Sequence, residues 1–194
     1  MRKLFAVLAL LVSFNALADS KLGIMGSLNY NTSENDDLDG VTGVDEKSGV
    51  GFGIGLRALM GITDQLYFRS GAGIVNKRWS YDINDSGIDG SAKMSFVYLN
   101  VPATLYWKAS PQIGFFGGTA LQAKLSDDCD GDGNITSCEA RNTKSIVLPA
   151  IIGFDFNINE QLALEISYEH GITEVAKDTK VHSAVVSFIF NFGN

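Results

Sequence analysis

The sequence lacks long apolar runs, apart from one at its start. Residues 4–14, "LFAVLALLVSF", follow Arg2 and Lys3 and precede Ala16-Leu17-Ala18, the small-x-small pattern of a signal-peptidase site. This run is well short of the ~20 residues that a membrane-spanning helix needs, and no later segment supplies such a run. The pattern predicts a cleaved secretory signal peptide over residues 1–18. The lack of longer apolar runs excludes a bundle of membrane-spanning helices.

Basic residues are also in deficit. The chain has 15 Lys and Arg against 22 Asp and Glu, a net charge of −7. Two of the basic residues lie in the predicted signal peptide, so the exported chain would be still more acidic. A surface of this sign repels nucleic acid and favours cations. We therefore expect no nucleic-acid partner.

Cysteine occurs only twice, at Cys129 and Cys138. No Cys follows Ala18, which argues against a lipoprotein anchor. An exported chain reaches an oxidising compartment, where these two residues could form a disulfide. Two unpaired thiols are the alternative.

Histidine is equally scarce, with His170 and His182 alone. An enzyme of the envelope needs a nucleophile and a base that converge near one rim. Glu169 and Ser183 are next to His170 and His182 in the sequence. However, the adjacent residues His182 and Ser183 would point to opposite faces of a strand. We expect no enzymatic activity and read the histidines as rim residues.

What the sequence does contain is alternation of apolar and polar residues. In "HSAVVSFIFNF" one parity is apolar and the other is more polar, which is typical of a strand. Eight such segments recur, at 21–31, 48–60, 65–80, 92–108, 113–125, 144–158, 161–172 and 181–192. Closed bacterial outer-membrane barrels have an even number of antiparallel strands. The expected fold is all-β: an eight-stranded antiparallel transmembrane β-barrel over residues 19–194.

The two parities predict which face meets lipid. One parity is almost free of charge over all eight segments. The other carries Arg57, Arg69, Lys77, Lys124, Asp155, Glu165 and Glu169. Ionic side chains in a narrow interior must pair, so we predict a polar, filled interior with an ionic network of Arg57, Arg69, Asp155, Glu165 and Glu169. A soluble periplasmic ligand-binding barrel, with its apolar parity inward, is the alternative.

The connections alternate in length. Tight turns are expected at 61–65, 109–112 and 157–161, and longer polar loops at 32–47, 81–91, 126–143 and 173–180. Short periplasmic turns and long extracellular loops are the habit of this barrel class. Sixteen of the 22 acidic residues lie in the four long loops, so the outer rim is expected to be strongly anionic.

Two stretches carry a family resemblance. "SFVYLNVPATLYWK" at 95–108 and "IIGFDFNINEQLALEISYEHGITEV" at 151–175 resemble strands of the small outer-membrane β-barrels of the OmpA/OmpX type, in particular the PorT-like outer-membrane barrel family. The resemblance implies a bacterial outer-membrane location, contact with lipid and lipopolysaccharide, and insertion by the barrel-assembly machinery. Phe192 is followed by two more residues, whereas a terminal Phe is usual for that machinery.

One loop carries a metal motif. In "DDCDGDGNITSCEA" the residues from Asp128 onward match the spacing of an EF-hand calcium loop without flanking helices. The predicted Ca²⁺ ligands are Asp128, Asp130, Asp132, Asn134, Thr136 and Glu139. A solvated, turn-rich acidic loop is the alternative. With the disulfide, the segment 126–143 would form a stapled site for an extracellular partner or for lipopolysaccharide. A purely structural envelope barrel without metal is the other possibility.

Overall fold

The computed structural model describes residues 20–35, 43–85, 88–133, 138 and 142–192. The predicted signal peptide, residues 1–18, lies outside the described residues, as do Asn134, Thr136 and Glu139.

The described chain is built from strands. They are β1 (Ser20–Asn35), β2 (Val44–Gly61), β3 (Leu66–Asp85), β4 (Ile88–Lys108), β5 (Ile113–Gly133), β6 (Ile146–Val147), β7 (Pro149–Asn157), β8 (Leu162–Gly171) and β9 (Thr179–Asn191). Among these described residues, no helix has the length and apolar character to cross a membrane.

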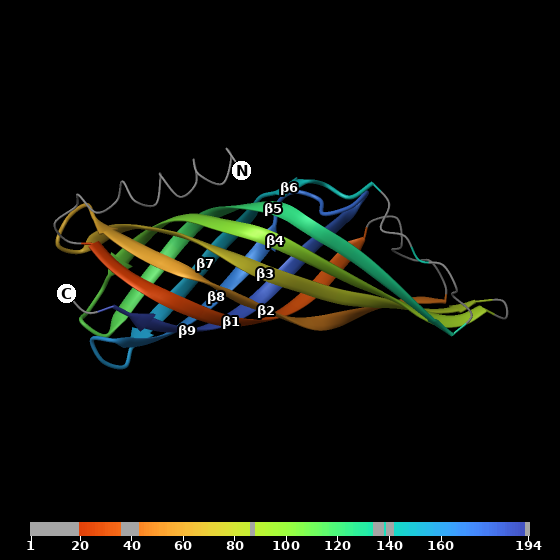
Figure 1. Ribbon diagram of the computed structural model, residues 1–194, viewed down its shortest axis with the longest axis horizontal. Coiled ribbons are helices and arrows are strands. Elements are labelled where there is room, and N and C mark those ends of the chain that lie inside the picture. The colour runs from red at the N-terminus through yellow and green to blue at the C-terminus, as the bar shows by residue number, and fades with distance from the viewer. Residues whose placement is uncertain (1–19, 36–42, 86–87, 134–137, 139–141, 193–194) are drawn as a thin grey trace.

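The strands close into a barrel (Figure 1). Each pairs antiparallel with its neighbour, β4 pairs with β5, and β1 pairs with β9 to close the ring. Strands β6 and β7 lie against β5 in one continuous register, with Leu148 between them, so together they fill one position. The ring therefore has eight positions, and the predicted eight-stranded antiparallel barrel is confirmed.

The apolar parity faces outward. Leu28, Phe52, Ile152 and Phe188 on four different strands are each 59–67% exposed, while Asn29, Ser167 and Ser187 are buried inside. A row of this kind around a closed sheet is the lipid-facing band of an outer-membrane barrel. The predicted orientation, with the apolar parity outward and the polar parity inward, is confirmed.

Five strands, β1 to β5, extend at their outer ends four or more residues beyond the predicted segments. The predicted loop 32–47 is partly strand, because β1 continues to Asn35 and β2 begins at Val44. The segments 81–91 and 126–143 are expected to be loops, but β3 continues to Asp85, β4 begins at Ile88 and β5 continues to Gly133. Residues on these extensions pair across the strands, as Ser91 does with Asp82 on β3 and with Asp132 on β5. The ladder persists because backbone hydrogen bonding does not depend on the apolar pattern that marked the strands in the sequence.

These extensions form a projection from the barrel. We use this name for residues 44–48 of β2, 80–85 of β3, 88–95 of β4 and 126–133 of β5. The projection is the long tapering end of the molecule in Figure 1, opposite the end where β1 begins and β9 ends. The tight turns 62–65, 109–112 and 158–161 lie at that other end, which we assign to the periplasm.

Candidate functional site

The interior of the barrel holds buried ion pairs. Arg57 on β2 donates from Nη1 to Asp155 on β7 at 2.9 Å, and the same nitrogen lies 3.8 Å from Glu165 on β8. The hydroxyl of Tyr106 donates to the second oxygen of Asp155 at 2.7 Å. The carboxylate of Asp155, which is fully buried, thus has a charged and a neutral donor. Burial of a carboxylate requires partners of this kind.

Further outward along the barrel, two more pairs cross the interior. Arg69 donates from Nη2 to both oxygens of Glu165, at 2.7 and 2.8 Å, and its guanidinium lies over the ring of Phe116 at 4.2 Å. Lys77 donates to Glu169 at 2.6 Å, and Gln122 donates to the same carboxylate oxygen at 3.2 Å. All five predicted network residues therefore lie in the interior, but Glu169 pairs with Lys77 and not with an arginine.

Aromatic side chains close the interior at its outer end. The ring of Trp79 stacks on Phe96 with centroids 5.0 Å apart, and Phe96 lies 6.1 Å from the nearly parallel ring of Tyr98. Val147 on β6, Val181 on β9 and Val175 between β8 and β9 complete this buried cluster. Because the cluster spans the barrel, the interior is filled. This closure was not predicted from the sequence, although the inward parity of Phe96 and Tyr98 is a signal for it.

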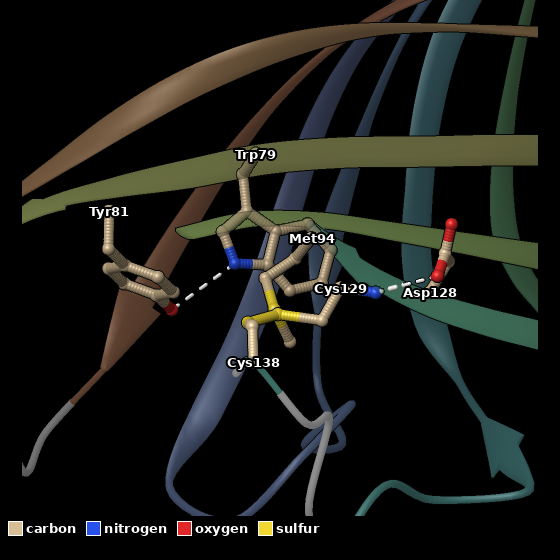
Figure 2. Close-up of a disulfide and its surroundings, with 6 residues drawn as sticks. All are labelled: Trp79, Tyr81, Met94, Asp128, Cys129 and Cys138. Atoms are coloured by element: carbon tan, nitrogen blue, oxygen red, sulfur yellow. Dashed lines mark hydrogen bonds between the residues drawn. A yellow bond between two sulfur atoms is a disulfide. The ribbon is translucent and has the colours of Figure 1, made fainter. Parts of the chain in front are cut away.

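The disulfide sits on the inner face of the projection, next to these aromatics (Figure 2). Cys129 on β5 is bonded to Cys138, and their Cα atoms are 5.5 Å apart. Met94 on β4 is opposite Cys129 in the register, and its sulfur lies 3.1 Å from that of Cys129. Trp79 donates from Nε1 to the hydroxyl of Tyr81 at 3.2 Å on the same side. The disulfide therefore ties Cys138 to β5 next to the aromatic cluster.

The described calcium candidates lie on an extended strand. Asp128, Asp130 and Asp132 are part of β5 and face Ser95, Lys93 and Ser91 in the register. Alternate residues of a strand are about 6.6 Å apart, so these three side chains line one face in a row. Among the described residues, no group of three or more His, Cys, Asp or Glu side chains is arranged to hold a metal ion. The metal prediction stays a prediction, since Asn134, Thr136 and Glu139 lie outside those residues.

A small polar cluster anchors the base of the same segment. Lys124 donates to Asp127 at 2.8 Å and is hydrogen-bonded to Thr143, which donates to Asp127 at 2.9 Å. The hydrogen bond from Lys124 holds the pKa of Asp127 below its ordinary value, with a smaller contribution from Thr143. A lowered pKa means that this stabilisation is complete above the ordinary carboxyl pKa and is lost as the pH falls through the lowered value.

The histidines lie on the outer side of the barrel wall. Nε2 of His182 is 3.1 Å from Glu34 on β1, and its ring centroid is 4.6 Å from that of His170. Ser183 points inward, where its hydroxyl donates to Asn31 at 2.7 Å. Glu169 is also inside, paired with Lys77. In the described part of the chain these four residues do not form a nucleophile and base pair, and the absence of enzymatic activity stays a prediction.

The fold and its outward apolar band agree with a comparison against known families. Residues 14–177 match the family model described as outer membrane protein beta-barrel domain. The chain belongs to this family. Its location is the bacterial outer membrane, and the alternative of a soluble periplasmic barrel is wrong, because the apolar parity faces outward.

Solved structures show the same fold for this outer-membrane barrel. Ail, the attachment invasion locus protein of Yersinia pestis, was solved in complex with the heparin analogue sucrose octasulfate; it is 12% identical, with a TM-score of 0.53 over 90% of this chain and 99% of Ail. Neisserial surface protein A is 12% identical, with a TM-score of 0.50 over 90% of this chain and 99% of that chain. A search of curated protein sequences found no significant match.

The disulfide of this outer-membrane barrel leads to a chemical prediction. Because Cys129 and Cys138 are bonded to each other, neither should react with a maleimide until the protein is reduced. After reduction in denaturant, both should react. Mass spectrometry of the labelled protein measures this directly, and labelling of both residues in the unreduced, denatured protein would contradict the bond.

Proposed function

We propose that this protein acts at the bacterial surface as an interaction protein, with the projection as its binding element, and that Ca²⁺ bound by residues 128–139 shapes that element. The observation that carries the proposal is the length of the strands. β3, β4 and β5 have 20, 21 and 21 residues. A strand needs about 9–11 residues to cross the membrane, so half of each strand is available outside it.

The charge of the projection limits the kind of partner. Asp128, Asp130 and Asp132 line the outer face of β5. Among the described basic residues, only Lys93 forms an ion pair with one of them, at 3.9 Å from Asp132. Both side chains of that pair are more than half exposed, so the pair is worth little. An acidic face of this kind attracts cations and repels polyanions. The partner is therefore a cationic surface, or an anionic one bridged by divalent cations.

The disulfide supports the calcium part of the proposal. Cys129 and Cys138 occupy positions 2 and 11 of the calcium motif, and their Cα atoms are 5.5 Å apart. In the sequence, Asp128 directly precedes Cys129 and Glu139 directly follows Cys138, so the disulfide ties together the two ends of the motif. Positions 1 and 12 of such a loop both bind the ion. Calcium would draw the acids together from the extended arrangement of β5.

Calorimetric titration of Ca²⁺ into refolded residues 19–194 in detergent tests this site. We expect saturable one-site heat with a Kd in the ~10⁻⁴–10⁻³ M range of extracellular modules, and no comparable heat with Mg²⁺. Glu139→Gln should abolish the heat because it removes the bidentate ligand.

The matched control is Asp45→Asn, which neutralises an exposed acid on β2, at the far edge of the projection. It should bind Ca²⁺ as the parent does. Heat that persists in Glu139→Gln, or that both variants lose equally, would contradict a specific site. The heat would then come from general attraction of Ca²⁺ to the acidic surface. No heat up to about 10 mM would leave a barrel with an inert acidic segment.

A bridging role has its own test. The Ail structure contains a heparin analogue, and an acidic projection should bind such a polyanion only when Ca²⁺ links the two. We expect immobilised heparin to retain the protein in millimolar Ca²⁺ and to release it on chelation. Equal retention with and without Ca²⁺ would contradict the bridging role.

A purely structural envelope barrel is the second candidate function. It is favoured by the interior, where Arg57, Arg69 and Lys77 are matched by Asp155, Glu165 and Glu169 and where the aromatic cluster closes the outer end. Such a barrel would show neither calcium heat nor heparin retention.

A further inference from the structure

We propose that the periplasmic mouth of the barrel binds a small solute that carries a carboxylate together with a hydrogen-bond donor. This inference is independent of the projection, which lies at the opposite end. It rests on a cavity of about 360 Å³ at the mouth, between the tight turns. Pockets of about 300–1,000 Å³ are the usual size for small-molecule sites.

Two lysines give the mouth its charge. Lys21 on β1 and Lys108 on β4 line the cavity. Their sequence neighbours Leu22 and Trp107 face lipid, 43% and 51% exposed, so strand alternation directs both lysines inward. Neither lysine forms an ion pair with another described residue, whereas Arg57 below them is satisfied by Asp155. Glu160, on the rim, is the one carboxylate among the lining residues.

An unused acceptor lies in the wall of the same cavity. Asn191 on β9 is 5% exposed and lines the mouth, and its Oδ1 is buried with no hydrogen-bond partner in the described chain. A buried carbonyl oxygen without a partner is costly, and most such oxygens in proteins are paired. A rotation of the Asn191 amide that turns Oδ1 toward the cavity would let an N–H or O–H group of a ligand supply the missing donor, while the ligand's carboxylate would meet the lysines.

The floor and walls make this mouth a pocket and not a channel. Tyr106, held by its hydrogen bond to Asp155, closes the floor together with Arg57. Tyr67 meets Tyr106 edge to face, with ring centroids 6.0 Å apart, and gives the wall an apolar surface. A solute that enters from the periplasm therefore meets a closed floor, a cationic rim and an aromatic wall.

The test is a titration of ¹⁵N-labelled residues 19–194 in detergent with N-acetyl-alanyl-alanine, followed by amide chemical shifts. We expect saturable shifts at Gln112, Asn159 and the side-chain amide of Asn191, which line the cavity. The same peptide with a C-terminal carboxamide is the matched ligand control. It should bind about threefold to tenfold more weakly, as expected for the loss of partly exposed ion pairs.

Variants separate this site from general attraction. In Lys21→Gln/Lys108→Gln, the difference between the acid and the amide peptide should disappear. Lys93→Gln makes the same change on the projection and should keep that difference. Equal shifts with both peptides in the parent protein, or no saturation at about 10 mM, would overturn the proposal. Circular dichroism of each variant establishes that the barrel has folded.

Discussion

Glu165→Ala is expected to lower the free energy of unfolding of the barrel by about 3–5 kcal/mol, because it leaves buried charge without a partner. The carboxylate of Glu165 is 2% exposed and accepts two hydrogen bonds from Arg69, while Arg57 lies 3.8 Å away. The loss of stability exceeds the attraction between Glu165 and Arg69, because the guanidinium of Arg69 stays in the interior without its partner. Urea unfolding in lipid vesicles, with linear extrapolation, measures the change.

Two further variants fix the interpretation of that loss. Glu160→Ala removes an exposed acid from a tight turn and should change the stability by no more than about 0.5 kcal/mol. Arg69→Met/Glu165→Leu removes both members of the pair and should recover a large part of the loss, as replacement of buried ion pairs by apolar residues often does. A single variant no more destabilised than Glu160→Ala would show that the interior tolerates an unpaired charge.

Phe188→Arg is expected to lower the stability of the barrel in lipid by about 2–4 kcal/mol, the cost of a basic side chain at the bilayer midplane. Phe188 is 65% exposed, and its register partners are Gly26 on β1 and Leu164 on β8, near the middle of the apolar band. The same unfolding measurement in vesicles gives the value.

The matched control is a residue of the same outward-facing parity, close to the end of β9. Phe192 is also outward-facing, 48% exposed, but it comes just after β9 at the periplasmic end. Phe192→Arg should cost only about 0–1 kcal/mol, because the cost falls near the interface. Equal costs at the two positions would contradict the assignment of this parity to lipid.

The periplasmic half of the fold could be predicted from the sequence. The alternation of Leu164, Ile166 and Tyr168 with polar residues fixes both a strand and its faces, because a strand has a period of two. The predicted turns 109–112 and 157–161 agree with strands that end at Lys108 and Asn157 and resume at Ile113 and Leu162. Within the membrane, lipid imposes the apolar parity, so the pattern is strong there.

The projection could not be predicted in the same way. Above the membrane, lipid no longer selects apolar residues for one parity, so 81–85 and 126–133 lose the alternation that marks a strand. The Asp and Gly residues of 127–133 therefore predict a turn-rich loop, although in the structure they pair with β4 residue by residue.

The partners within the ionic network are a separate case. Parity places Lys77 and Glu169 inside, but which acid meets which base depends on the stagger of the strands around the ring. That stagger brings Glu169 on β8 to Lys77 on β3, and Tyr106 on β4 to Asp155 on β7. Pairings of this kind come from closure of the barrel and have no local signature in the sequence.

The projection also has a mechanical consequence. β3, β4 and β5 run without a break from the barrel wall to the tip, and their backbone hydrogen bonds lie across the strand direction. A pull along these strands would load those bonds in shear, so that many would have to break together before β5 slid past β4. If a partner held the cell by this tip, force on the tip would therefore pass to the barrel and to the outer membrane before the strands of the projection separated.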